Sequence, residues 1–484
     1  MIDRIALYTD HHNLEALLFF DTPIYFIFLI LVTALYWRLG HRSQNRLLLA
    51  ASYFFYGWWD WRFLFLMAGS TVVDYAISKR ISSIENPSQR RRLLGLSLVM
   101  NFGFLAYFKY VNFFLDSTAR LLSTVGIHGV SHSFLHIILP PAISFYTFQE
   151  VAYIVDVYYR KLEPAESLES YALFISLFPH LVAGPIQRPS HLLPQVQRER
   201  RFDSTAFFNG CLLIVSGLIR KCVIADNCAI VANAGFSGNL GAGWLPHLLG
   251  VYAFAFQIYG DFSGYSDIAR GSAQLLGFHF MVNFRQPYLA TSLQDFWRRW
   301  HISLSTWLRD YLYIPLGGSR CGEFNTYRNL LFTMLLGGLW HGANWTFVIW
   351  GALHGIGLAV ERFVGFGSSE KSSNWGSAIR ALLLFQFVCF TWVFFRADSL
   401  SASLRFLAAF MHRSDIYEVL PVVGFLAFFV ALAVLFDIVS EWFEVEFVVA
   451  LLHPAYQIAF ALAGLLLATA MSSGVPSTFI YFQF

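Results

Sequence analysis

Three histidines lie in or just before one long apolar stretch of the chain, at positions 301, 341 and 354. From Leu330 to Val360 no side chain carries a formal charge, and His341 and His354 are the only ones that titrate near neutral pH. A helix needs roughly 20 apolar residues to cross about 30 Å of hydrocarbon. His341 lies eleven residues into the run, which at about 1.5 Å per residue is roughly half of that thickness. We therefore predict a membrane-spanning helix with an imidazole near its middle.

An ionisable side chain at mid-membrane is expensive and is a functional candidate by default. Glycines at positions 337, 338 and 342 flank His341, and a glycine lets another backbone or a ligand come close. Two interpretations are open at this point. His341 either performs chemistry on a bound substrate or is a core histidine bonded to a backbone carbonyl.

The segment just before this run, from Asp295 to Tyr313, is dense in arginine and tryptophan. At about 100° per residue, its aromatic and leucine side chains fall on one wide face, with His301 at the edge. Arg298, Arg299 and Arg309 fall on the other side. The pattern predicts an amphipathic helix at the membrane interface, with its aromatics at the lipid boundary and its arginines toward the headgroups. An anchor helix without any chemical role would show the same pattern.

The composition is that of a membrane protein. Hydrophobic residues make up 57% of the chain, charged residues 13%, and the mean hydropathy is +0.54, whereas soluble domains carry about 25% charged residues. The net charge of +3 is too small to indicate a nucleic-acid partner. The five cysteines show no C-x-x-C spacing, so we predict neither a disulfide framework nor a metal site. The lipid bilayer is the partner that the composition implies.

The order of apolar segments predicts an all-α, polytopic membrane protein with about eleven transmembrane helices. Two embedded pieces are not expected to cross: the amphipathic segment above and residues 171–187, which are broken by Pro179 and Gly184-Pro185 between basic flanks. We predict that 171–187 re-enters on the same side. Residues 79–92 form a basic loop, which the positive-inside rule places in the cytoplasm.

Residues 1–484 are expected to form one membrane domain, in which 295–360 is the catalytic core and 1–17 is an N-terminal extension of unknown purpose.

Another group of polar residues lies in the apolar segment 245–277, which contains Asp261, Asp267 and Arg270. The two aspartates are six residues apart and point to different faces of a helix. We interpret them as ion-pair partners inside the helix bundle rather than as an acid/base pair.

Four motifs together carry a resemblance to a known family. They are D-F-W-R-R-W-H-I-S-L-S-T-W-L-R-D-Y-L-Y-I-P-L-G-G, G-G-L-W-H-G-A-N-W, F-P-H-L-V-A-G-P-I and D-F-S-G-Y-S-D. With them, the chain resembles the bacterial membrane-bound O-acyltransferase (MBOAT) family from about Leu18 onward, and within it the members that serve alginate O-acetylation. The resemblance implies helices around a central active-site tunnel, with His341 as the active-site histidine and His301 as the second histidine of the site.

The resemblance also implies an activity. It is an O-acetyltransferase that moves acetyl groups from a cytoplasmic thioester donor, with acetyl-CoA expected, across the membrane for O-acetylation of an extracytoplasmic polysaccharide. No bound cofactor is implied. A periplasmic acetyltransferase of the SGNH type is the expected partner, and the bacterial inner membrane the expected location. The resemblance leaves the acceptor open among alginate, cellulose, peptidoglycan or another polysaccharide. It also leaves open whether the enzyme forms a covalent acyl intermediate and what its oligomeric state is.

The chemistry suits such a reaction. Acyl transfer from a thioester needs a base for the incoming hydroxyl and stabilisation of the tetrahedral oxyanion. Burial keeps a histidine neutral, so His341 can act as the base, and His301 can position the donor or relay a proton. Trp340 and Asn344 are candidate hydrogen-bond donors to the oxyanion or the imidazole. His354 is thirteen residues after His341, on another side of a helix, and we interpret it as structural.

Arginines near the cytoplasmic interface suit the phosphates of coenzyme A, although headgroup anchoring explains them as well. The candidates are Arg298, Arg299 and Arg309. The same fold with a D-alanyl or longer acyl cargo is the alternative within the family. A polytopic transporter also uses broken helices and polar residues inside spans. We disfavour a transporter because the sequence shows no inverted repeat and its polar residues gather around one histidine-bearing run.

Overall fold

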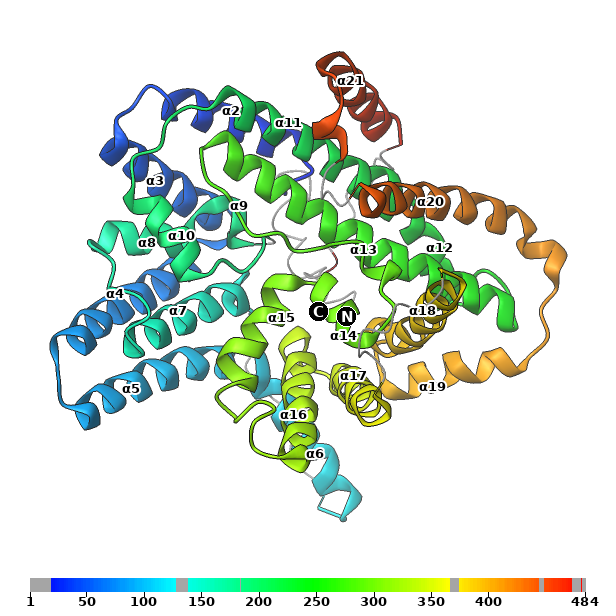
Figure 1. The fold of residues 1–484 in the computed structure, drawn as a ribbon. Coiled ribbons are helices and arrows are strands. Elements are labelled where there is room, and N and C mark those ends of the chain that lie inside the picture. Colours follow the sequence, from blue (N-terminus) through cyan, green and yellow to red (C-terminus); the bar gives the residue numbers. More distant parts are fainter. Residues whose placement is uncertain are drawn as a thin grey trace. The chain divides into compact units, whose positions relative to one another are not determined.

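The structure is a computed structural model, and every regular element in the part of the chain that it describes is a helix (Figure 1). The described residues are 19–127, 138–182, 184–365, 374–443, 448–471 and 480. The expected N-terminal extension, 1–17, lies outside them. The chain divides into two compact units. The first comprises Met1–Ile27, Asp203–His341 and Trp345–Phe484, and the second comprises Phe28–Phe202 and Gly342–Asn344.

The second unit contains most of the N-terminal helices, including a short π-helix. They are α2 (Pro23–Tyr36, which begins in the first unit), α3 (His41–Asp60), α4 (Arg62–Ser83), α5 (Pro87–Leu105), η2 (Ala106–Tyr110), α6 (Val111–Thr124), α7 (Ile143–Tyr158), α8 (Leu168–Ser176), α9 (Phe178–Leu181) and α10 (Pro189–Gln197). The break predicted in 171–187 is confirmed, because α8 ends just before Leu177 and α9 is a single turn. The residues around the break are buried in protein, as broken backbone at membrane depth requires. Re-entry on the same side is still a prediction.

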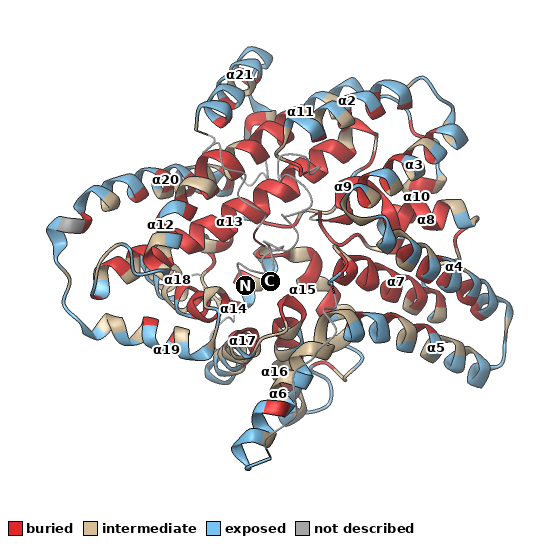
Figure 2. Cartoon of the chain, turned by 180° about the vertical axis from the view of Figure 1, so that it is seen from behind, coloured by how far each residue is buried: buried red, intermediate tan, exposed pale blue. Residues whose placement is uncertain are grey.

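The first unit is built around one long helix. Its elements are α11 (Ser204–Leu218), η3 (Ile219–Ala225), α12 (Asp226–Phe236), α13 (Trp244–Leu275), η4 (Pro287–Leu289), α14 (Leu293–Arg299), α15 (Ile302–Leu308), η5 (Arg309–Tyr313), α16 (Glu323–His341), α17 (Trp345–Val364), α18 (Asn374–Arg396), α19 (Leu400–Ala408), η6 (Ala409–Met411), α20 (Ile416–Trp442), η7 (Val448–Leu451) and α21 (Pro454–Met471). Helix α13 packs along α11 and α12 and is buried over most of its length (Figure 2).

Glycines let α11 and α13 approach closely. A Cβ on Gly217 would lie 2.6 Å from the carbonyl oxygen of Gly264, and a Cβ on Gly264 would lie 2.7 Å from that of Gly217. Any side chain at either position would push the two backbones apart. The helix that carries Asp261 is therefore held tightly against the helix that leads into η3.

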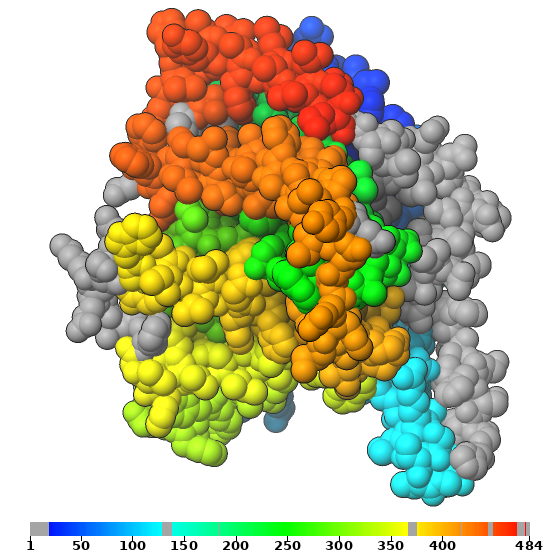
Figure 3. Space-filling model, turned by 90° about the vertical axis from the view of Figure 1, so that its right-hand side faces the viewer, coloured from blue at the N-terminus to red at the C-terminus, as the bar shows by residue number. Residues whose placement is uncertain are grey.

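Among the described residues, six helical segments are long and apolar enough to cross a membrane. They are Pro87–Thr124, Ser204–Phe236, Trp345–Val364, Trp375–Arg396, Val419–Trp442 and Pro454–Met471. Helices α20 and α21, drawn in orange and red in Figure 3, expose large apolar side chains such as Phe428, Leu435 and Leu466. The chain is thus a polytopic helical membrane protein, as predicted. The count of about eleven crossings and the central tunnel are still predictions.

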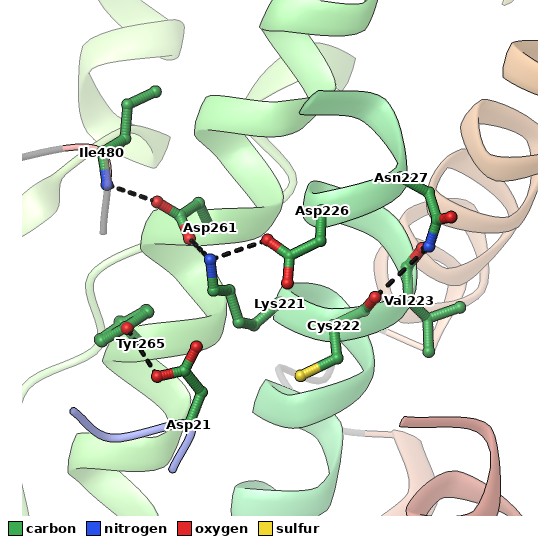
Figure 4. Close-up of polar contacts among 9 residues, drawn as sticks. All are labelled: Asp21, Lys221, Cys222, Val223, Asp226, Asn227, Asp261, Tyr265 and Ile480. Carbon is green, nitrogen blue, oxygen red and sulfur yellow. Dashed lines mark hydrogen bonds and ion pairs between the residues drawn. The ribbon is translucent and has the colours of Figure 1, made fainter. Parts of the chain in front are cut away.

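Buried ion pairs hold the centre of the first unit together (Figure 4). The Lys221 Nζ lies 2.8 Å from an oxygen of Asp226 and 2.8 Å from an oxygen of Asp261. The second oxygen of Asp261 accepts a hydrogen bond from the backbone N–H of Ile480 at 2.7 Å. Asp21 accepts one from the Tyr265 hydroxyl at 2.9 Å. We call these groups the Lys221 cluster.

A second pairing lies along the same helix. Asp267 is 3.5 Å from Arg220 and 3.5 Å from Arg270. The interpretation of Asp261, Asp267 and Arg270 as ion-pair partners inside the bundle is therefore confirmed. The basic residues that complete the pairing, Lys221 and Arg220, come from η3.

Candidate active site

The arginine- and tryptophan-rich segment is broken at a histidine. It forms α14, α15 and the π-helix η5, with His301 between α14 and α15 at φ 42° and ψ 55°. The prediction of one continuous amphipathic helix is wrong. The reason is a competing set of hydrogen bonds: the N–H of Ile302 donates to the carbonyl of Asn283 at 2.9 Å, and the N–H of Ser303 donates to its side chain at 3.2 Å. A left-handed conformation at a non-glycine residue is strained and is typical of functional sites.

The aromatic face of this segment packs on protein rather than on lipid. Phe296 and Trp300 are each 1% exposed. The Trp300 ring lies 5.1 Å from Phe284 and 5.2 Å from Trp392, centroid to centroid. The expectation that these aromatics lie at the lipid boundary is therefore wrong. The His301 ring contacts aromatic rings of other segments: it meets Phe262 edge-on at 4.6 Å, and Phe284 lies 6.4 Å away.

The apolar run around His341 is two helices rather than one. Helix α16 ends at His341, the turn 342–344 follows, and α17 begins at Trp345. The prediction of a continuous span with His341 in its middle is wrong. The nearby glycines explain the hairpin, because a Cβ on Gly338 would lie 2.2 Å from the carbonyl oxygen of Phe347. Gly338 thus serves the close packing of α16 on α17.

The structure brings His301 and His341 together although they are 40 residues apart in sequence. Their ring centroids are 6.5 Å apart. Trp340 lies 6.1 Å from the His301 ring and 5.0 Å from the His341 ring. Trp350 and Phe395 each lie 5.2 Å from His341. Both imidazoles are buried, at 0% exposure for His301 and 5% for His341, so they share one aromatic enclosure.

Asn283 fixes the orientation of His301, although nothing in the sequence marked it as a site residue. Its side-chain oxygen accepts hydrogen bonds from the N–H of Ser303 at 3.2 Å and from the Ser303 hydroxyl at 2.9 Å. Its nitrogen donates to Ser266 at 3.2 Å. The same oxygen lies 3.2 Å from Nδ1 of His301. Because a backbone N–H can only donate, this amide is oriented without ambiguity, and Nδ1 of His301 must carry the hydrogen.

The tautomer that follows leaves the lone pair of His301 on Nε2. Burial lowers the pKa of the His301 imidazole to about 3, so the ring is neutral throughout the physiological range. A neutral imidazole with its hydrogen on Nδ1 can accept a proton at Nε2. The only trace of Asn283 in the sequence is a lone amide between Val282 and Phe284 in an otherwise apolar strip.

His354 lies in the next layer of the same aromatic group. Its Nε2 is 3.0 Å from the Thr391 hydroxyl, and the side chain is fully buried. Trp350 separates it from His341, with its ring 4.8 Å from His354 and 5.2 Å from His341. A defined hydrogen-bond partner and a position behind Trp350 agree with a structural role.

The three arginines have different surroundings. Arg299 lies 2.8 and 3.0 Å from the two oxygens of Glu441 and 3.0 Å from Asp295. Arg309 is paired with its neighbour Asp310 at 2.7 Å. Arg298 is exposed. A phosphate would have to displace carboxylates from Arg299, whereas the exposed side chain of Arg298 is accessible to one.

Asn344, the remaining candidate, lies in the turn after His341, where its N–H donates to the carbonyl of Gly342 at 2.9 Å.

Comparison with known proteins identifies the family. Residues 165–400 match the sequence model of the MBOAT, membrane-bound O-acyltransferase family. A protein named probable alginate O-acetylase AlgI from Pseudomonas putida is 44% identical, over 82% of this chain and 81% of its own length. Its namesake from Pseudomonas aeruginosa is also 44% identical, over 81% and 74%. A peptidoglycan O-acetyltransferase from Helicobacter pylori is 38% identical, over 81% and 79%. The chain therefore belongs to the family of membrane-bound O-acyltransferases.

Proposed function

We propose that this protein is an O-acetyltransferase of the bacterial inner membrane that takes acetyl groups from cytoplasmic acetyl-CoA and supplies them for O-acetylation of a cell-surface polysaccharide. The observation that carries the proposal is the pairing of His301 and His341, whose ring centroids are 6.5 Å apart inside an aromatic enclosure. The relatives named for alginate and peptidoglycan O-acetylation support both the acetyl cargo and the polysaccharide acceptor. Alginate is the acceptor favoured by the more similar of these relatives.

His341 serves as the general base in this proposal. Its imidazole removes the proton of the incoming hydroxyl, whose oxygen attacks the thioester carbonyl and forms a tetrahedral intermediate. Collapse of the intermediate breaks the carbon–sulfur bond, and the imidazolium returns its proton to the departing thiolate. The step is balanced without any further reactant. Trp340, which adjoins both imidazoles, and Asn344 are the side chains whose N–H groups we assign to the oxyanion.

His301 positions the donor in this proposal, and Asn283 holds His301. The hydrogen on Nδ1 is committed to Asn283, so His301 can accept a hydrogen bond or a proton only at Nε2. The site is assembled from neutral groups, which suits a reaction that passes through an oxyanion in a desolvated enclosure.

The donor and the partner follow from the same hypothesis. Arg298 is the arginine that we assign to the phosphates of acetyl-CoA, because its exposed guanidinium contrasts with the carboxylate-bound Arg299. The predicted basic loop 79–92 is in fact the end of α4, a short turn and the start of α5; its basic residues still favour a cytoplasmic position for that end. An SGNH-type acetyltransferase in the periplasm would complete the transfer to the polymer.

A thioester assay tests the catalytic part of the proposal. The purified full chain in lipid vesicles is given acetyl-CoA, a D-alanyl thioester or palmitoyl-CoA, and the release of free thiol is followed. We expect release from acetyl-CoA, and its loss in His341→Gln. Preference for another thioester would change the cargo. Passage of an intact donor across the vesicle membrane without thiol release would mean a transporter.

A genetic experiment tests the partner. Deleting a neighbouring SGNH-type protein should abolish acetylation of the polymer, while this chain stays folded in the membrane and still releases thiol from acetyl-CoA. Full acetylation of polysaccharide by the isolated chain would contradict the need for a partner.

A further inference from the structure

Two carboxylic acids in the second unit are completely buried and play no part in the histidine site. Asp74 on α4 and Glu150 on α7 are each 0% exposed, and α4, α5 and α7 pack on one another. Neither acid takes part in an ion pair among the described residues. Two buried charges without a cation would be strongly unfavourable. The hydrogen bonds of each acid indicate how it is accommodated.

Asp74 has the surroundings of an ionised carboxylate. One oxygen accepts a hydrogen bond from the Ser97 hydroxyl, and the other accepts one from the Asn101 amide at 2.7 Å. Both donors come from α5. Donors on both oxygens stabilise the charged form of a carboxyl group.

Glu150 has different surroundings. Its Oε1 lies 2.9 Å from the Ser70 hydroxyl and 3.3 Å from that of Thr71, whereas its Oε2 is buried with no hydrogen-bond partner among the described residues. The Ser70 hydroxyl also lies 3.0 Å from the carbonyl of Met67. A hydroxyl has one hydrogen, and a carbonyl can only accept. If Ser70 donates to Met67, the hydrogen between Ser70 and Glu150 has to come from the carboxyl group.

We propose that Asp74 and Glu150 form a proton-binding site, in which Asp74 is ionised and Glu150 holds one proton at neutral pH. The proton on Oε1 donates to Ser70, which donates in turn to Met67. Ser70 and Asp74 are four residues apart on α4, so the two acids are held about one helical turn apart along that helix. Raising the pH removes the proton and leaves two like charges in the interior, so the second unit loses stability on the alkaline side.

Among the residues that the structure describes, no lysine or arginine forms an ion pair with either acid. The elements packed around the pair carry several phenols: Tyr53 and Tyr56 on α3, Tyr75 on α4, Tyr146 and Tyr153 on α7, and Tyr171 on α8. Charged groups gather at the helix ends: Lys79 and Arg80 on α4, Arg90 on α5, Asp156 on α7 and Glu169 on α8, with His191 on α10. Lys109 donates to Ser144 at 3.3 Å, six residues before Glu150, or about 9 Å along α7.

The site adjoins the F-P-H motif of the second unit. Gln149, next to Glu150, places its amide nitrogen 3.4 Å from Nδ1 of His180, and Nε2 of that ring lies 3.1 Å from the carbonyl of Phe174. His180 thus has a partner on each ring nitrogen and is a structural member of the broken segment α8–α9. Loss of the Glu150 proton would loosen α7 beside this segment first.

Thermal unfolding of the full chain in detergent at several values between about pH 6 and pH 9 tests the site. We expect the wild-type melting temperature to fall as the pH rises. Glu150→Gln should keep the neutral-pH value and lose most of that fall, because its amide also donates to Ser70. Asp74→Asn should melt lower at every pH, since its amide would face the Asn101 donor. Glu169→Gln is the matched control, a partly exposed acid paired with Arg46, and should behave like the wild type.

Infrared spectroscopy gives a direct second readout: the band of a protonated carboxyl group should be present in the wild type and weaker in Glu150→Gln. The proposal is overturned if Glu150→Gln fails to fold, melts as low as Asp74→Asn or keeps the wild-type pH dependence. It is also overturned if replacing choline by sodium raises the melting temperature of the wild type but not of Glu150→Gln, because the ligand is then a metal cation rather than a proton.

Discussion

The Lys221 cluster and the His301–His341 pair are both deeply buried polar groups of the first unit, but they are built in opposite ways. In the Lys221 cluster the two contacts of the lysine join opposite charges at 2.8 Å. Around the two histidines the contacts are aromatic rings and the neutral amide of Asn283. The Lys221 ammonium, which lies between two carboxylates, keeps its proton. A neutral imidazole among rings can accept a proton and return it.

The contrast distinguishes buried polar groups that stabilise the fold from buried polar groups that take part in the reaction. Breaking a buried ion pair leaves an uncompensated charge and is felt as a loss of stability. Removing a neutral catalytic group mainly raises the barrier of the reaction. Mutations in the Lys221 cluster should therefore change the melting temperature and leave turnover intact. Mutations of the histidine pair should change turnover and leave the melting temperature intact.

The largest effect is expected at His341. His341→Gln removes the proposed base, and general-base catalysis typically contributes about 10²- to 10⁴-fold. Thiol release from acetyl-CoA should fall by at least about that factor, while the melting temperature changes little. His354→Gln, one layer further from the site, is the control and should affect melting rather than turnover. Near-normal turnover of His341→Gln, or its failure to fold, would return His341 to the role of a core histidine.

Lys221→Met should show the reverse pattern. The variant leaves Asp226 and Asp261 buried without their cation, and removal of one partner of a buried pair costs about 3–5 kcal/mol of stability. We expect a large drop in melting temperature, and a turnover per folded molecule close to that of the wild type at low temperature. Adding Asp226→Asn and Asp261→Asn should recover part of the loss, because no charge is then unpaired. A stable single variant would mean that the cluster is not an anchor.

An effect of about tenfold is expected at Asn283, equivalent to one hydrogen bond of about 1–1.5 kcal/mol. Asn283→Ala should lower turnover by that factor without a pH dependence. Asn283→Asp places a carboxylate against Nδ1 and raises the pKa of His301, which burial holds at about 3 in the wild type. Turnover of the aspartate variant should then fall as the pH is lowered, because protonation removes the lone pair on Nε2.

Two controls separate this effect from a general loss of structure. Ser266→Ala removes only the contact to the other end of the Asn283 amide and should keep the wild-type pH profile. If His301→Ala lowers turnover while the Asn283 variants match the wild type, Asn283 does not position His301. If His301→Ala is itself fully active, the proposed role of His301 fails first.

The two sites also show which features could be predicted from the sequence and which could not. His341 was found because a titratable side chain is rare in an apolar stretch, and His301 was found through the family resemblance of the motif that contains it. The helix breaks beside them were not, since an amphipathic pattern hardly changes when one residue turns left-handed. The bonds that decide the local structure are also non-local: Asn283 reaches His301 across 18 residues, and Lys221 reaches Asp261 across 40. A single sequence contains the members of such pairs but not their pairing.

The smallest effect is expected at two neighbouring arginines, of which we assign one to donor binding and the other to stability. Arg298 is exposed, whereas Arg299 is held by Asp295 and Glu441. An exposed charge contributes about 0.2–1 kcal/mol, so Arg298→Gln should raise KM for acetyl-CoA by less than about fivefold. The increase should disappear at high salt, because the phosphates are then screened from the wild-type guanidinium as well. Arg299→Gln should instead lower the melting temperature and leave the salt dependence of KM unchanged. If Arg299→Gln alone changes KM, the carboxylates around it exchange with the donor, and the phosphate site lies one residue further along α14.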